Sequence, residues 1–166
     1  MTVTPLNLNP DVNRAHITTE KEEDRKMAET KYGKYFVKEP FAEGHFVTSL
    51  RFFAGRHFND INYSILWNCI TKPFVMEDRP HSHKFDQFLH FYGGNPLDIT
   101  DFGAEVEFSL GEEGEKHIIN KTTIIHIPKG LIHCPLNFKR VDRPIIFMNI
   151  AFVPDYHATR PEILRK

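Results

Sequence analysis

From about residue 35 onward the chain repeats one pattern: short stretches rich in aromatic and β-branched residues, separated by Gly, Pro, Asn and Asp. This pattern is typical of strands joined by turns. It predicts strands near 35–38, 46–53, 62–70, 85–92, 104–110, 115–120, 123–127, 132–138 and 144–153. Many short strands at close spacing, with few helices, indicate an all-β sandwich or barrel.

The sequence predicts three regions along the chain. Residues 1–34 are expected to form an N-terminal arm and a short charged surface helix, residues 35–155 the β-barrel, and residues 156–166 a C-terminal tail. The helix is predicted over 19–31, which contains good helix formers and almost no apolar stripe. Such a helix lies on the surface or forms against a partner.

Composition excludes several classes of protein. The chain has 166 residues, 40% of them apolar, and 15 phenylalanines, which is enough for one packed core. Its net charge is −1 with no dense run of Lys and Arg, so we expect no nucleic-acid partner. No apolar run is long enough to span a membrane, and no secretory signal is recognisable, so we expect a cytoplasmic protein. The two cysteines form no CxxC pair, which excludes a cysteine-rich zinc site.

Alternation along individual strands is informative at two places. In 104–110 apolar residues share one face and Glu105, Glu107 and Ser109 the other, as in a strand with one solvent-exposed side. Residues 145–153 are apolar on both faces apart from Asn149, as in a strand covered on both sides. For 62–70 the sequence does not decide which face points inward.

Two histidines and a glutamine occupy positions that differ by even numbers in the segment 80–87, Pro-His-Ser-His-Lys-Phe-Asp-Gln. If this segment is extended, His81, His83 and Gln87 point to one face, because side chains alternate along a strand. Two imidazoles at this spacing can bind one metal ion at about 2.0–2.1 Å, and a glutamine can add its amide oxygen. Taken alone, the His-x-His pair also fits two incidental histidines on a solvent-exposed strand.

A further candidate ligand, His133, follows a Pro-x-Gly turn at 128–130 and lies in an apolar segment. A histidine between Ile132 and Cys134 fits a hydrogen-bonded core residue, which is the common case. A buried neutral imidazole is also what a metal ion requires. Both interpretations of His133 remain open on the residues alone.

The two segments resemble the two sequence motifs of the cupin superfamily. The first motif has the form Gly-x5-His-x-His-x(3,4)-Glu-x6-Gly and the second Gly-x5-Pro-x-Gly-x2-His-x3-Asn. The residues that match them are His81, His83, Gln87 and Gly94 in the first, and Pro128, Gly130, His133 and Asn137 in the second. The match covers 75–137 directly, and flanking strands extend it to about 40–154. The resemblance implies a single cupin barrel, a double-stranded β-helix or jelly roll.

The resemblance also implies a divalent transition metal inside the barrel. Its ligands would be His81, His83, Gln87 and His133, and Zn, Fe, Mn, Ni and Co are all candidates. The leading glycines of the motifs are replaced by Val75 and Thr122, which affects turns rather than chemistry.

Gln87 stands where cupins usually carry Glu, and this departure does affect the chemistry. Four neutral donors leave the site with a formal charge near +2 instead of +1. That lowers metal affinity and makes the ion a stronger Lewis acid. Alternatively Gln87 does not coordinate and three histidines form the site.

The motifs leave the reaction open. No nucleophile elbow, P-loop or dinucleotide-binding pattern is present, so in an enzyme the metal would carry the chemistry. We expect Lewis-acid chemistry on a small carboxylate or oxygen-chelating substrate, of isomerase, lyase or decarboxylase type. A cupin-type Fe(II)-dependent dioxygenase and a non-catalytic small-molecule sensor are the alternatives. An acid or base beside the metal would favour an enzyme, and the sequence reveals none.

Two polar residues within apolar strands have uncertain roles. Arg51 can pair with a substrate carboxylate, but we expect it to face solvent. Asn149 is either a group near the substrate or a residue at an edge or interface. Besides a small-molecule ligand, we expect a second copy of the chain as partner, in a homodimer that exchanges the arm or an edge strand and so protects sheet edges.

Overall fold

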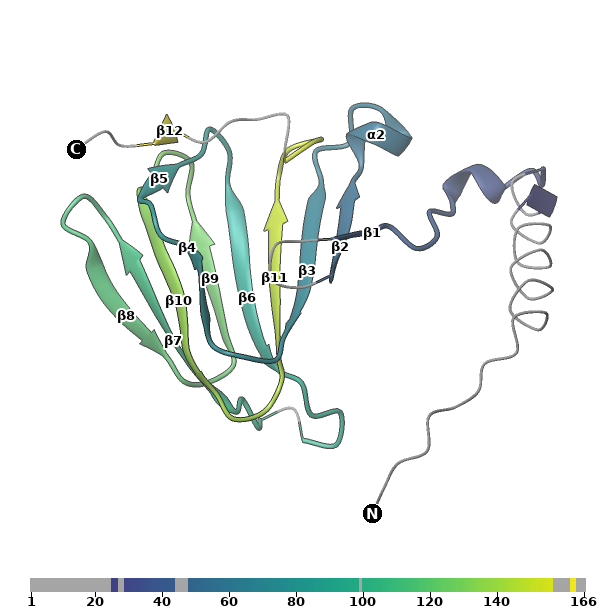
Figure 1. Ribbon diagram of the computed structural model, residues 1–166. Coiled ribbons are helices and arrows are strands. Elements are labelled where there is room, and N and C mark those ends of the chain that lie inside the picture. Colours follow the sequence, from purple (N-terminus) through teal and green to yellow (C-terminus); the bar gives the residue numbers. More distant parts are fainter. Residues whose placement is uncertain (1–24, 27–28, 44–47, 99, 157–161, 164–166) are drawn as a thin grey trace, which may run out of the picture. The chain divides into compact units, whose positions relative to one another are not determined.

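The computed structural model describes residues 25–26, 29–43, 48–98, 100–156 and 162–163 (Figure 1). The chain divides into two compact units, Met1–Lys38 and Glu39–Lys166. In the first unit, the described residues include one turn of 3-10 helix, η1 (Gly33–Tyr35), and an exposed Arg25–Glu29 ion pair of 3.6 Å. Most of the predicted helix over 19–31 lies outside the described residues. The strand predicted at 35–38 is wrong, because this aromatic stretch has no strand partner and Phe36 is 63% exposed.

The second unit is built from two antiparallel sheets that face each other (Figure 1). Sheet A contains, in spatial order, β1 (Phe41–Glu43), β2 (Thr48–Phe53), β3 (Ser64–Ile70), β11 (Ile145–Ala151), β6 (Gln87–Gly93) and β9 (Thr123–Ile127). Sheet B contains β12 (Glu162–Ile163), β5 (His81–Ser82), β10 (His133–Val141), β7 (Ala104–Leu110) and β8 (Glu115–Ile119). Strand β4 (Phe74–Glu77) also pairs with β10. This arrangement is a jelly roll, which confirms the predicted fold class.

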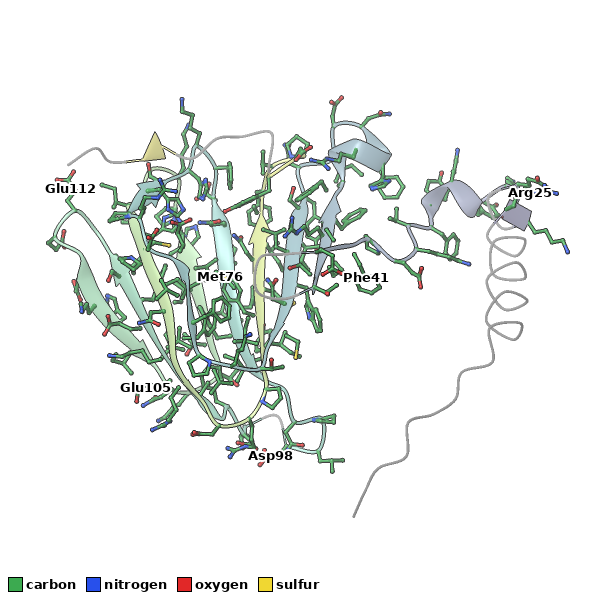
Figure 2. All side chains as sticks on the ribbon, viewed as in Figure 1. Arg25, Phe41, Met76, Asp98, Glu105 and Glu112 are labelled. Atoms are coloured by element: carbon green, nitrogen blue, oxygen red, sulfur yellow. The ribbon has the colours of Figure 1, made fainter. Side chains whose placement is uncertain are left out.

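The core lies between the sheets and is largely aromatic. Phe91 of β6, Phe108 of β7 and Phe138 of β10 are fully buried. The Phe91 ring lies 5.1 Å from that of Phe147 and 6.5 Å from that of Phe138, so residues of both sheets meet there. In Figure 2 the labelled Met76 of β4 lies among the side chains that fill the space between the sheets. Burial of such rings is the main stabilising contribution in a domain of this size.

Predicted and observed strands agree best where alternation is regular. Strands β7 and β9 have the predicted bounds. Strands β1, β4 and β5, and the four-residue helix α2 (Gly55–Phe58), are additional elements. Each of them has at most four residues, which is too short for a periodic pattern to register.

The inner face of sheet A is unexpectedly polar. Ser64, Asn68 and Ile70 of β3 are buried, whereas Ile65, Trp67 and Cys69 on the other face are only partly buried. Asn149 on the neighbouring β11 is buried as well. The structure therefore decides the orientation of residues 62–70 that the sequence left open: the face with Ser64 and Asn68 points inward.

The turn before β10 connects the two motif segments. Gly130 has φ of +84°, a left-handed conformation that favours glycine. Its N–H donates to the His83 carbonyl over 2.9 Å. The Pro-x-Gly turn thus binds the main chain beside His83 and positions the strand that begins at His133. Among the described residues, no helix is long and apolar enough to cross a membrane.

Candidate metal and ligand site

A cavity of about 300 Å³ lies between the two sheets. Sheet A supplies its polar residues from β2, β3, β6 and β11, and sheet B supplies histidines and a cysteine. The lining residues are Ser49, Arg51, Leu66, Asn68, Phe74, Met76, Glu77, His81, Gln87, Leu89, His133, Cys134, Leu136, Phe147, Asn149 and Tyr156. This volume suits a small organic molecule together with an ion.

His81 and His133 form the centre of the candidate metal site. They are register partners on β5 and β10, and their ring centroids are 4.4 Å apart. The Nδ1 atom of His81 lies 2.9 Å from the Arg79 carbonyl, and Nδ1 of His133 lies 2.9 Å from the Leu131 carbonyl. A carbonyl accepts only from an N–H, so both rings carry their proton on Nδ1 and keep a lone pair on Nε2. Metal-ligating histidines are commonly oriented in this way.

Cys134 joins these two histidines, and the sequence analysis missed it as a site residue. One ligand atom from each of His81, His133 and Cys134 lies within 4.8 Å of the others. Neighbouring residues of a strand normally face opposite ways, but Cys134 has φ of +77° and the β10 register shifts between His133 and Leu136. Burial and the Glu77 carboxylate raise the pKa of the Cys134 thiol to about 12. The signal available in the sequence was a cysteine directly after the motif histidine.

Gln87 reaches the site from sheet A and is 1% exposed. Its Nε2 lies 3.1 Å from Nε2 of His133, which accepts this hydrogen bond because the His133 proton is on Nδ1. Its amide oxygen, Oε1, is buried and has no hydrogen-bond partner. A buried acceptor without a partner is costly, and a cation would satisfy it.

His83 lies beside this group but outside the set of mutually close ligand atoms. Its ring centroid is 5.0 Å from that of His81 and 5.3 Å from that of His133. Its Nε2 lies 3.1 Å from the Tyr156 hydroxyl, whereas its Nδ1 is buried without a partner. Burial, together with His133 and His81, lowers the pKa of His83 to about 3.

The prediction that residues 81–87 form one extended strand, with His81, His83 and Gln87 on the same face, is wrong. Strand β5 ends at Ser82 in sheet B, the chain bends over 83–86, and β6 starts at Gln87 in sheet A. His81 and Gln87 therefore converge on the cavity from opposite sheets. His83 lies in the crossing segment, where alternation along a strand does not apply.

Tyr156 and Asn149 form the wall next to His83. A side-chain hydrogen bond joins Asn149 to Tyr156, and burial raises the pKa of the Tyr156 phenol. Asn149 Oδ1 is buried without a partner. Asn149 is thus a group of the cavity rather than of an edge. Tyr156, from the region predicted as a tail, lines the same cavity.

The cavity also contains one cation and one carboxylate. Arg51 of β2 lines it, so the expectation that Arg51 faces solvent is wrong. Glu77 of β4 lines it as well and accepts a hydrogen bond from the Arg79 N–H over 3.1 Å. Next to them, Ser49 donates to Asn68 Oδ1 over 2.6 Å. The acid or base absent from the sequence analysis is therefore available as Glu77.

Known proteins match this chain in the comparison of structures and not in the two comparisons of sequence. No protein-family profile matches the sequence, and no curated protein does. A mutant of Bacillus subtilis oxalate decarboxylase superposes with a TM-score of 0.50 at 11% identity, over 75% of this chain and 30% of that chain. The polyketide cyclase RemF from Streptomyces resistomycificus gives 0.49 at 14% identity, over 78% of both chains. A cupin-superfamily sugar phosphate isomerase from Silicibacter pomeroyi gives 0.43 at 16% identity, over 64% of this chain and 59% of that one.

These likenesses concern the fold. The chain spans about 30% of the oxalate decarboxylase chain, and identities near 10% carry no information on activity. The two facing antiparallel sheets and the order of the strands agree with the jelly roll that the sequence motifs implied. This chain has the cupin fold, as the resemblance predicted.

Proposed function

We propose that this protein is a metal-dependent enzyme that acts on a small carboxylate or oxygen-chelating substrate by Lewis-acid chemistry. One observation carries the proposal. Two histidines with oriented Nε2 atoms, His81 and His133, lie in a cavity that also contains Arg51 and Glu77. An isomerase, lyase or decarboxylase reaction suits this combination, because each needs a polarised oxygen and a group that moves a proton.

The residues present fit a divalent transition metal. His81 and His133 would hold it through Nε2, with Gln87 Oε1 as an additional donor that now has no partner. On metal binding, His133 Nε2 would give up the hydrogen bond that it accepts from Gln87. His83 could join through Nδ1, which has no partner, or through Nε2 if that atom gave up its hydrogen bond to Tyr156. A bound ion would supply Lewis-acid polarisation of a substrate oxygen. Zn, Fe, Mn, Ni and Co all remain candidates.

Arg51 supports a carboxylate substrate. Its guanidinium can donate two parallel hydrogen bonds to a carboxylate, the geometry that arginine recognises best. Arg51 is partly buried and shares the cavity with the apolar residues Leu66, Leu89 and Phe147, which strengthens such a pair relative to one in bulk water. In the proposal, Arg51 binds and orients the substrate.

Glu77 favours an enzyme over a sensor. Oxygen Oε1 of its carboxylate accepts from the Arg79 N–H, which fixes the group at the cavity wall. We assign proton exchange with the substrate to the second oxygen, Oε2. A positioned carboxylate contributes about 10²–10⁴-fold to a proton-transfer step.

The first test is metal analysis of protein purified without added metal. We expect about one equivalent of a transition metal in the wild type and a strong loss in His81→Ala. His117→Ala is the matched control, because His117 is an exposed histidine on β8. A metal-free wild type that also takes up no added metal would contradict the proposal.

The second test is a reaction screen of the loaded protein with small mono- and dicarboxylates and 2-oxo acids. Turnover without oxygen consumption supports Lewis-acid chemistry. Oxygen consumption would point instead to the Fe(II)-dependent dioxygenase. Tight binding without turnover of any bound compound would point to the non-catalytic sensor.

A further inference from the structure

We propose that Cys134 is the anionic ligand of the metal site and replaces the carboxylate that Gln87 no longer provides. This inference rests on the proposed function, because it specifies the donor set of the same site. The donors would be the Nε2 atoms of His81 and His133 and the Sγ atom of Cys134, with Gln87 Oε1 as a weaker donor.

Cys134 lies close enough to both histidines to share a metal ion with them. Ligand atoms of His81, His133 and Cys134 lie within 4.8 Å of one another in a buried position. Bonds of about 2.0–2.1 Å to nitrogen and about 2.3 Å to sulfur require ligand atoms roughly 3.3–4 Å apart, a gap that small side-chain rotations can close. The left-handed backbone at Cys134 turns its side chain into the cavity that His133 also lines.

A second observation does not involve the cysteine. The Oε1 atom of Gln87, a residue that lines this cavity, is buried and has no hydrogen-bond partner. Because Gln87 Nε2 lies 3.1 Å from His133 Nε2, the amide group is within reach of the metal position. His83, by contrast, neither lines the cavity nor belongs to the set of mutually close ligand atoms.

A cysteine ligand would also restore the charge that the site loses with the motif glutamate. A divalent ion with neutral nitrogen and amide donors keeps a formal charge of +2. When the M–S bond forms, the Cys134 thiol releases its proton to solvent, and the resulting thiolate lowers the site charge to +1. That is the charge a motif glutamate would give. A thiolate also favours thiophilic ions such as Zn²⁺ or Fe²⁺ over Mn²⁺.

Cobalt substitution of the full-length protein tests this donor set. We expect Co²⁺-loaded wild type to show an intense sulfur-to-cobalt charge-transfer absorption. Cys134→Ser should remove this band and weaken Co²⁺ binding by about tenfold or more. Cys69→Ser is the matched control, because Cys69 lies on the opposite face of sheet A and does not line the cavity. We expect Cys69→Ser and His83→Ala to keep the band.

X-ray absorption at the metal edge of the wild type provides a readout that needs no variant. A sulfur neighbour at about 2.3 Å supports the inference. Co²⁺ bound with only nitrogen and oxygen neighbours would overturn the inference and leave the proposed function intact. Failure to bind any metal would overturn both.

We also propose, from the apolar side chains on the outer face of sheet A, that this face is a docking surface for a second copy of this chain. Three rows of cross-strand partners make up this face. They are Phe41–Leu50–Trp67–Met148–His90–Ile124, Phe52–Ile65–Ile150–Phe88–His126 and Cys69–Ile146–Tyr92. None of these side chains is Asp, Glu, Lys or Arg. Phe41 is 60% exposed and Ile124 is 54% exposed.

Size and charge favour a second copy as the occupant. Five strands about 4.8 Å apart, with three rows of side chains, make a face of about 500 Å² in projection. A stable dimer buries about 800 Å² of accessible surface on each partner. Accessible surface follows the contours of the side chains, so its area is larger than the projected area of the same face, and the two values are of the same order. Charged side chains lie only at the margin of this face, where Glu43 accepts from Thr48 and Asp86 lies 3.2 Å from His126 Nε2. The apolar centre fits the identical centre of another copy about a two-fold axis. By contrast, the chain's own segment 19–31 is densely charged and lacks an apolar stripe.

The oligomeric state of the full chain tests this surface. We expect a dimer by analytical ultracentrifugation at micromolar concentration. Ile124→Glu and Met148→Lys should each raise the dimer dissociation constant at least about tenfold. Ile118→Glu is the matched control, since Ile118 is 51% exposed on sheet B. A monomeric wild type, or a dimer that both variants leave intact, would overturn the proposal.

Discussion

The two faces of sheet A invert the usual pattern of a soluble sheet. Its inner face has a succession of polar groups, with Ser49, Asn68, Gln87 and Asn149 all buried. Its outer face is apolar across β2, β3, β11, β6 and β9. Burying polar groups costs free energy unless a partner satisfies them, and exposing apolar groups also costs free energy. The two proposals account for this difference, since they assign a ligand to the inner face and a second copy of the chain to the outer face.

The largest expected effect is a difference in the free energy of unfolding between variants on the two faces of strand β6. Phe91 of β6 is fully buried in the core, whereas Phe88 of the same strand lies on the outer face against His126. We expect Phe91→Ala to lower the free energy of unfolding by about 3–5 kcal/mol, the usual cost of a large core cavity. Phe88→Ala should cost roughly 1 kcal/mol when urea unfolding is measured at low protein concentration. Equal losses would show that the outer face is not exposed as described.

Gln87→Glu tests whether the inner polar groups are arranged for a cation. In metal-free protein, a carboxylate at a position that is 1% exposed should lower the free energy of unfolding by about 2–3 kcal/mol at pH 7, because burial disfavours its charge. Added Zn²⁺ should restore more stability to this variant than to the wild type. Thermal unfolding with and without Zn²⁺ measures both. If metal stabilises the two proteins equally, Gln87 does not face the ion.

Acid should destabilise the metal-free protein through His83 and His133, two buried histidines that lie outside sheet A. The pKa values of His83 and His133 are lowered to about 3 and about 4, mainly by burial, from an ordinary value of 6.5. Below pH 6.5 the unfolded chain therefore binds protons that the folded chain does not, so stability falls with pH down to about pH 4. From pH 7 to pH 5 we expect a loss of about 2 kcal/mol for each of the two histidines.

Urea unfolding as a function of pH measures this loss. His83→Gln should reduce the slope. His126→Gln, which changes an exposed histidine of the outer face, should leave the slope nearly unchanged. A slope that is insensitive to His83→Gln would mean that this residue is not buried in the neutral form.

The smallest effect concerns ligand recognition by the inner face. Arg51→Gln should weaken binding of a small carboxylate by about tenfold, because one charge-assisted pair is lost. Arg56→Gln is the control, since Arg56 forms an exposed ion pair with Asp155. Calorimetric titration measures both. Unchanged affinity in Arg51→Gln would assign the carboxylate to another part of the cavity.

Regular alternation was the most reliable guide to the fold. Strands β7 and β9 could be bounded from the sequence because their side chains alternate between environments. For β3 alternation did not decide which face points inward, since a polar face ordinarily indicates solvent and here lines a cavity. The short elements β4 and β5 gave no pattern, although Glu77 and His81 come from them.

In the candidate site, too, some residues could be predicted from the sequence and others could not. Motif spacing selected His81, Gln87 and His133, and all three line one cavity. It also selected His83, whose Nε2 lies 3.1 Å from the Tyr156 hydroxyl and whose Nδ1 has no partner. Glu77 and Arg51 could not be assigned from spacing, because they approach the histidines only through the pairing of β4 with β10 and the facing of the two sheets. Cys134 follows His133 directly, but regular alternation would turn it away from His133, and only its left-handed backbone brings it to the cavity.

By itself, the sequence determined the cupin jelly roll and the residues that approach its centre, because strand periodicity and motif spacing are local properties of the chain. Only the tertiary structure decided which side of sheet A faces inward and which groups surround the motif histidines. Those outcomes depend on a bulge at Cys134 and on a crossing between sheets at residues 83–86. Both bring together side chains whose proximity no local pattern records, since the contacts form between segments distant in sequence.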